Sequence, residues 1–121
     1  AFEIMEQVIH AWKLLQTTEL VQARTIKSIS FLENGEPLHN YDAVVEACRF
    51  IQQKFELNGN QINMSTYGVA PQRIKDLCQD LPQASLTIRL HASREKVRRS
   101  MIQVNDAKDD INNKFNNLIK A

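Results

Sequence analysis

The sequence predicts an α/β fold in which about three parallel strands alternate with helices, in the order helix, strand, helix, strand, helix, strand, helix. Three short runs rich in β-branched residues are separated by single stretches with apolar residues at three-to-four spacing. Each run ends in a polar turn that leads into the next helical pattern. Strands joined by single helices pair in parallel through right-handed crossovers. A small three-layer sheet and part of a (β/α) barrel both satisfy this order.

Composition predicts one soluble domain over residues 1–121, with 43% apolar and 24% charged residues. The net charge of +1 gives the chain no general attraction to nucleic acid. No apolar run approaches the roughly 18 residues of a membrane span, so we expect no membrane partner. Cys48 and Cys78 both fall in helical patterns, and we expect buried, reduced thiols in an intracellular protein. Because the first residue is Ala, we expect a processed product or a piece of a longer protein.

The first half of the chain contains two helices with a strand between them. An amphipathic helix covers residues 2–16, and a strand covers 25–31. A Gly-Glu-Pro loop follows, and Asn40 is a suitable N-cap for a helix that starts near Tyr41. We expect the segment 58–60 to end this helix through its Gly. The apolar face of this second helix comprises Val44, Val45, Cys48, Ile51 and Phe55.

The second half repeats the alternation. A strand at 61–66 leads through residues 67–70 to Pro71, which suits the first turn of a helix. Pro82 ends that helix, since it lacks an N–H and restricts the residue before it. The third strand, 85–92, alternates cleanly, and Ser93 caps a last helical region. The inner face of the third helix comprises Ile74, Leu77, Cys78 and Leu81.

Polar residues stand at the end of each predicted strand. They are Glu36 after the first, Ser65 with Thr66 in the second, and Arg89 with His91 in the third. The carboxyl ends of parallel strands share one rim, where ligands bind. Glu36 suits an ammonium group, Ser65 a ribose or carboxylate, and His91 a further ligand atom. Each also has a structural explanation: a helix cap for Glu36, a hydroxyl turn for Ser65, and a hydrogen-bonded rim histidine.

Arg89 belongs to the polar set of the third strand, where a buried guanidinium needs an acidic partner. We expect Glu36 or Glu33 to be that partner. A locally basic run follows, and it suits either phosphate contacts or a solvated helix face. The run comprises Arg89, His91, Arg94, Lys96, Arg98 and Arg99.

Three motifs together resemble the RlmN/Cfr-type radical SAM adenine methyltransferases. Residues 34–45 resemble their Gly-Glu-Pro-Leu-x-Asn-Tyr-Asp segment, and 63–71 resemble their Ser-Thr-x-Gly-Val-x-Pro strand end. Residues 86–92 resemble their Leu-Ala-x-Ser-Leu-His-Ala strand, and the segment from Glu3 to Val8 resembles the helix after their cluster loop. The spacing between motifs agrees as well, over about residues 3–105.

The resemblance implies a partial (β/α) barrel with about three parallel strands and four to five helices. It also implies S-adenosylmethionine and a [4Fe–4S] cluster, used to methylate an adenine of ribosomal RNA or tRNA. Carried over, Gly35 and Glu36 contact the methionine amino group and Ser65 reaches the ribose side. Leu90 and His91 line the next part of the pocket. Asn105 matches one of two asparagines in the family, which the sequence does not distinguish.

The departures from the family predict a change of role. The family's Cys-x-x-x-Cys-x-x-Cys loop has no counterpart here, and two cysteines do not hold the cluster. Arg89 replaces a small Ser at the cofactor wall. We therefore expect this chain to be catalytically inactive by itself and to serve a ribonucleoprotein assembly, such as a ribosome of the cytoplasm, mitochondrion or plastid. Partners would be ribosomal RNA, bound through Arg94, Lys96, Arg98 and Arg99, or the assembly's proteins.

The alternative to this interpretation is that the chain is a core fragment of an active S-adenosylmethionine-dependent adenine-C2 methyltransferase acting on 23S rRNA or tRNA. In either case an incomplete barrel leaves strand edges unpaired, and we expect a partner or a second copy to cover them.

Overall fold

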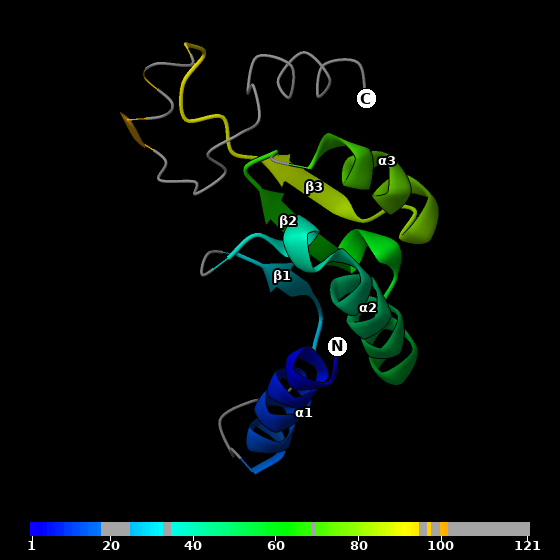
Figure 1. The fold of residues 1–121 in the computed structure, drawn as a ribbon. Helices are drawn as coiled ribbons and strands as arrows, with labels where there is room; N and C mark the ends of the chain where they lie inside the picture. Colours follow the sequence, from blue (N-terminus) through cyan, green and yellow to red (C-terminus); the bar gives the residue numbers. More distant parts are fainter. Residues whose placement is uncertain (18–24, 33–34, 69, 95–96, 98–99, 102–121) are drawn as a thin grey trace.

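A computed structural model describes residues 1–17, 25–32, 35–68, 70–94, 97 and 100–101. Helices and strands alternate in the predicted order as far as the third strand (Figure 1). The elements are α1 (Phe2–Thr17), β1 (Ile29–Phe31), the 3₁₀ turn η1 (Pro37–Asn40), α2 (Tyr41–Phe55), the 3₁₀ turn η2 (Gly59–Gln61), β2 (Ile62–Thr66), α3 (Pro71–Asp80) and β3 (Ser85–Ile88).

The three strands form one parallel sheet in the order β1-β2-β3, which confirms the predicted α/β class. Two strands are shorter than predicted. β1 begins at Ile29 rather than residue 25, because β2, which starts at Ile62, offers it no earlier partner. β3 ends at Ile88 rather than residue 92, because its partner β2 stops at Thr66 and the chain then turns at Gly68.

The core lies between one face of the sheet and the helices. Ile62 and Met64 of β2 are fully buried there, beside the apolar face of α2. Tyr41 at the start of α2 donates a hydrogen bond of 2.7 Å to Asp80 at the end of α3, which links the two helices. The buried core residues are Leu38, Tyr41, Val44, Val45, Ala47, Cys48, Ile51, Leu57, Ile62, Met64, Leu77 and Leu81.

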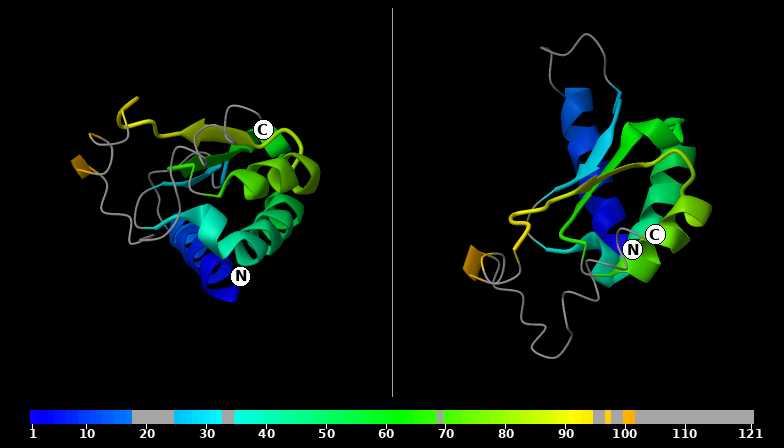
Figure 2. Two further views of the ribbon diagram at one scale, coloured as in Figure 1. Left: turned by 45° about the horizontal axis from the view of Figure 1, so that its top comes forward. Right: turned by 90° about the horizontal axis from the view of Figure 1, so that it is seen from above.

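Helix α1 is attached more loosely. It packs against α2, beside which it lies in Figure 2, but none of its residues is fully buried. Trp12 meets Phe55 edge to face, with ring centroids 6.0 Å apart. The predicted amphipathic helix is therefore confirmed, and its apolar side covers the end of α2 with only partial burial.

The opposite face of the sheet is polar. Ser30, Asn63 and Ser85 are neighbours in the strand register, so their side chains share this face. Ser85 and Thr87 are both exposed. In the described residues the helical core covers only the other face.

Asn40 occupies the predicted N-cap position of α2, although its side chain makes no capping hydrogen bond and Glu36 caps the preceding turn η1. Two local predictions were wrong. Helix α2 ends at Phe55, with Glu56 at its C-cap in left-handed φ 55°, and not at Gly59, which lies in η2. Cys78 is exposed, since only the side of α3 that carries Leu77 faces the core.

The described strands form an open sheet, and a barrel remains a prediction. The predicted last helical region, 93–119, falls mostly outside the described residues. Within the described part, no helix combines the length and the apolar character that crossing a membrane requires.

Candidate functional site

Glu36 connects the loop after β1 to the end of β2. Its Oε1 accepts a hydrogen bond of 2.7 Å from the Thr66 hydroxyl and one of 3.1 Å from the Leu38 N–H. Its Oε2 accepts a hydrogen bond of 2.8 Å from the Tyr67 N–H. The carboxylate thus holds two strand ends together and caps η1. We call this arrangement the Glu36 clamp.

The residues on either side of Glu36 fix its backbone. Gly35 adopts φ +133°, a conformation that favours glycine, although a Cβ there would meet no atom within 4 Å. Pro37 begins η1, where its fixed φ and missing N–H suit the first position. The Gly-Glu-Pro sequence therefore encodes the turn that aims the carboxylate at β2.

The Arg89 guanidinium covers Ser65. Arg89 Nε donates a hydrogen bond of 2.7 Å to Ser65 Oγ, and Ser65 is only 7% exposed although it lies on the open face of the sheet. The Arg89 backbone N–H also donates to the Thr66 carbonyl at 2.8 Å, which continues the ladder one residue beyond β3. The guanidinium is therefore anchored by both its backbone and its Nε.

Two rings complete this strand-end cluster. The Arg89 guanidinium carbon lies 6.0 Å from the centroid of the Tyr67 ring. The Tyr67 and His91 rings are 5.4 Å apart and tilted by 39°. His91 Nδ1 lies 3.2 Å from the Arg89 carbonyl oxygen. We call Ser65, Tyr67, Arg89 and His91 the Arg89 cluster.

The predicted pairing of Arg89 with Glu36 is wrong. No ion pair joins them in the described residues, because the Glu36 oxygens are bound by Thr66, Tyr67 and Leu38. Glu33, the other predicted partner, lies outside the described residues. Arg89 is half-buried rather than fully buried, so a hydroxyl and solvent are sufficient for its donors.

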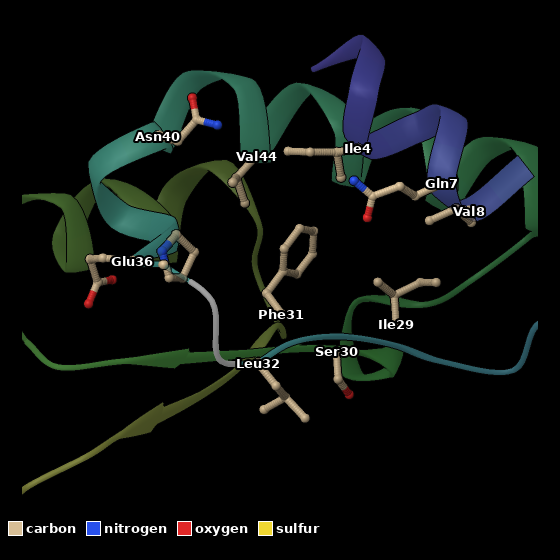
Figure 3. A pocket seen from close by; sticks show the side chains of 12 residues that line it. Ile4, Gln7, Val8, Ile29, Ser30, Phe31, Leu32, Glu36, Asn40 and Val44 are labelled. Carbon is tan, nitrogen blue, oxygen red and sulfur yellow. The ribbon is translucent and has the colours of Figure 1, made fainter. Parts of the chain in front are cut away.

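A groove of about 540 Å³ lies beside the Glu36 clamp, between α1, β1 and the start of α2 (Figure 3). Phe31 points into it, whereas Ser30 and Leu32 point to the other side of the strand. Gly35 and Glu36 line the groove, but no member of the Arg89 cluster does. The predicted residues therefore do not all converge on one cavity.

Of the remaining predicted residues, the structure describes Leu90 and Arg94. Leu90 is 50% exposed, and Arg94 is exposed. Asn105 and the basic residues Lys96, Arg98 and Arg99 lie outside the described residues.

Sequence reasoning placed Thr66 beside Ser65 at the second strand end but did not predict its contact with Glu36, and it gave Tyr67 no role of its own. Tyr67 carries the ring against which both Arg89 and His91 lie. The available signal was a bulky aromatic residue directly after a Ser-Thr strand end, where a turn favours small residues.

The thiols present do not fit a [4Fe–4S] cluster. The chain has two cysteines, one buried on α2 and one exposed on α3. Burial raises the pKa of the Cys48 thiol to about 12, which disfavours the thiolate that iron requires. In the part of the chain that the structure describes, no three His, Cys, Asp or Glu side chains gather as a metal site.

The residues fit S-adenosylmethionine only in part. A carboxylate offers about four acceptor positions, and three donors occupy the Glu36 clamp, so among the described residues one position on Oε2 has no donor and suits an ammonium group. Ser65 is instead covered by a guanidinium. A cation at this point repels a sulfonium-bearing ligand.

Curated proteins named RlmN are similar to most of this chain. The chain is 35% identical over 106 residues to the probable dual-specificity RNA methyltransferase RlmN of Salinibacter ruber. The aligned residues make up 86% of this chain and 28% of that protein. It is 35% identical over 104 residues to the same-named protein of Clostridium novyi, with 84% and 28% covered. It is 32% identical over 108 residues to the protein of this name from Frankia casuarinae, and the aligned residues make up 85% of this chain and 25% of that protein.

The other two comparisons add nothing to this relationship. No family model matches the chain, and no solved structure matches it. The chain spans about a quarter of the length of these curated relatives. The identity extends over most of this chain. These relatives support the RlmN-type resemblance that the motifs at Glu36, Ser65 and His91 predicted.

Proposed function

We propose that this RlmN-like segment does not itself catalyse methyl transfer and serves as an RNA-binding, structural component of a ribonucleoprotein assembly. The observation that carries the proposal is the Arg89–Ser65 hydrogen bond of 2.7 Å. It sets a permanent cation at the wall where the family resemblance calls for a small residue. The two cysteines of the chain also do not suffice for the cluster.

Charge supports RNA as the partner. Arg89 and Arg94 follow β3 on the same stretch, and Lys96, Arg98 and Arg99 continue it in the sequence. Clustered Lys and Arg side chains bind phosphates with strong salt dependence. The relatives are named RNA methyltransferases, which is consistent with an RNA-facing surface retained after the chemistry was lost.

The open sheet supports protein partners as well. β1 and β3 are the outer strands of the described sheet, and each has one edge without a neighbouring strand there. Exposed edges of this kind pair readily with another chain. We therefore include in the proposal that a partner or a second copy covers these edges.

One observation favours a second candidate, the core segment of an active S-adenosylmethionine-dependent methyltransferase. The Glu36 clamp keeps its geometry and one acceptor position open. Under this alternative, Arg89 would have to move away from Ser65 when the cofactor binds.

Calorimetry with S-adenosylmethionine separates the two candidates. We expect no saturable binding to the 121-residue chain, because Arg89 covers Ser65 and repels the sulfonium. The Arg89→Ser variant, which restores a small side chain, is the matched comparison and should bind at least about tenfold better. In parallel, we expect a fluorescent single-stranded RNA to bind and to lose affinity as salt rises.

Two results would contradict the proposal. Stoichiometric S-adenosylmethionine binding by the unchanged chain would favour the active-enzyme alternative. Absence of any salt-sensitive RNA binding would remove the RNA role, whatever the cofactor result.

A further inference from the structure

The Arg89 guanidinium is held in place, and most of its donors have no partner among the described residues. Nε donates to Ser65, and the backbone N–H donates to Thr66, so both ends of the residue are fixed. Among the described residues, neither Nη1 nor Nη2 has a hydrogen-bond or ion-pair partner. These two nitrogens carry four N–H donors in one plane. Such a fork matches two oxygens of a phosphate.

The rings beside Arg89 suit a planar group. The Tyr67 and His91 rings lie 5.4 Å apart, and His91 is exposed. Aromatic rings and arginine planes are the surfaces on which unpaired nucleobases stack. The cluster therefore combines a donor pair for phosphate with a ring surface for a base, at the carboxyl ends of β2 and β3.

The local charge selects for an anion. Among the described residues, no carboxylate lies within ion-pair distance of the Arg89 guanidinium. A cationic ligand would meet an uncompensated guanidinium, whereas a phosphate would be stabilised by it. This preference is the opposite of that needed for a sulfonium.

We propose that the Arg89 cluster is a binding subsite for a nucleotide, with Arg89 on the phosphate and Tyr67 with His91 on the base. The inference rests on the proposed RNA role and deepens it by naming the residues that hold one nucleotide. The shared chemistry is a phosphate ester next to a nucleobase, which either an RNA strand or a free nucleotide supplies.

The test compares four probes by calorimetry or fluorescence anisotropy: adenosine 5′-monophosphate, adenosine, S-adenosylmethionine and a single-stranded RNA of about eight nucleotides. We expect the monophosphate to bind at least about tenfold more tightly than adenosine, because only the former engages the guanidinium. Arg89→Gln should remove that difference. Tyr67→Ala should weaken the monophosphate about fivefold or more through lost stacking.

Arg73→Gln is the matched control. Arg73 also lies over a tyrosine ring, that of Tyr41, at 4.7 Å, but on the helical layer. The Arg73→Gln substitution removes the same charge as Arg89→Gln and should leave binding of the monophosphate unchanged. Arg89→Lys, checked for folding by circular dichroism, keeps the charge without the planar donor pair and should recover only part of the affinity.

The outcomes are separable. Equal losses in Arg89→Gln and Arg73→Gln, or full recovery in Arg89→Lys, would reduce the effect to general charge and overturn the subsite. RNA binding that survives Arg89→Gln unchanged would keep the RNA role and overturn the subsite. Monophosphate binding without RNA binding would keep the subsite, identify a free nucleotide as the source, and overturn the RNA role.

Discussion

At the scale of single residues, Glu36 is the connection that the motif encodes. The sequence predicted its position after the first strand and its fixed backbone between Gly35 and Pro37. It did not predict that the carboxylate would bind Thr66 and Tyr67, some 30 positions away in sequence. Such contacts depend on how β1 and β2 align, which no local pattern specifies.

Substitution of Glu36 should destabilise the fold. Glu36→Gln exchanges one acceptor oxygen for an NH₂ group, which would face either the Tyr67 N–H or the Leu38 N–H and leave a donor unpaired. We expect a loss of about 1–3 kcal/mol in the free energy of unfolding. Urea denaturation followed by circular dichroism measures it. Glu46→Gln, on the exposed side of α2, is the control and should change stability by less than about 0.5 kcal/mol.

The Arg89 prediction shows where reasoning from residue type alone was insufficient. It assumed that a polar position on an alternating strand is buried and so requires a carboxylate. Arg89 lies one residue beyond the end of β3 and is half-buried, so the Ser65 hydroxyl is an adequate partner. Burial at a strand end depends on what covers the sheet face.

At the scale of elements, α2 and α3 differ in how deeply they are buried. Six residues of α2 are buried, whereas α3 buries only Leu77. The same spacing of apolar residues predicted both helices. The predicted inner face of α3 was too wide, because it included Cys78, which is exposed.

This difference predicts the behaviour of the two thiols. Burial raises the pKa of Cys48 to about 12, so at pH 8 its thiol is protonated and inaccessible. A disulfide-exchange reagent should therefore modify Cys78 rapidly and Cys48 only after denaturation, as mass spectrometry would record. Cys78→Ser should abolish the fast phase and Cys48→Ser should not. Two equally fast thiols would contradict the packing of α2.

The raised pKa also fixes the sign of a pH effect. Cys48 ionises near its ordinary value of 9.0 in the unfolded chain but only near 12 when folded. Below pH 9 the thiol is protonated in both states, so it does not change the free energy of unfolding. As pH rises from 9 towards 12, only the unfolded chain loses the proton, and the free energy of unfolding falls. In Cys48→Ala this part of the alkaline loss should disappear.

At the scale of the whole molecule, the described sheet has helices on one face and a polar opposite face. Ser85 and Thr87 are exposed on that face, and β1 and β3 have open edges in the described part of the chain. A parallel sheet is normally covered on both faces. We propose that further protein or RNA covers the face and the edges that stay open in the described residues.

Association should be measurable in solution. We expect sedimentation velocity on the purified chain to show concentration-dependent association, because open edges pair with one another. Thr87→Lys places a charge on the open face of β3 and should weaken that association. A monomer at all concentrations, equally stable with and without the substitution, would contradict the proposal that a partner or second copy covers the edges.

The sequence by itself determined the order of elements as far as the third strand, the parallel sheet and the resemblance to RlmN proteins, because these depend on local periodicity, turn residues and motif spacing. Only the tertiary structure decided which polar groups meet. It joined Glu36 to Thr66 and Arg89 to Ser65, and it separated the Glu36 groove from the Arg89 cluster. The physical reason is that hydrogen bonds between distant residues follow from strand register and from what covers each face. Neither is encoded in a local stretch of sequence.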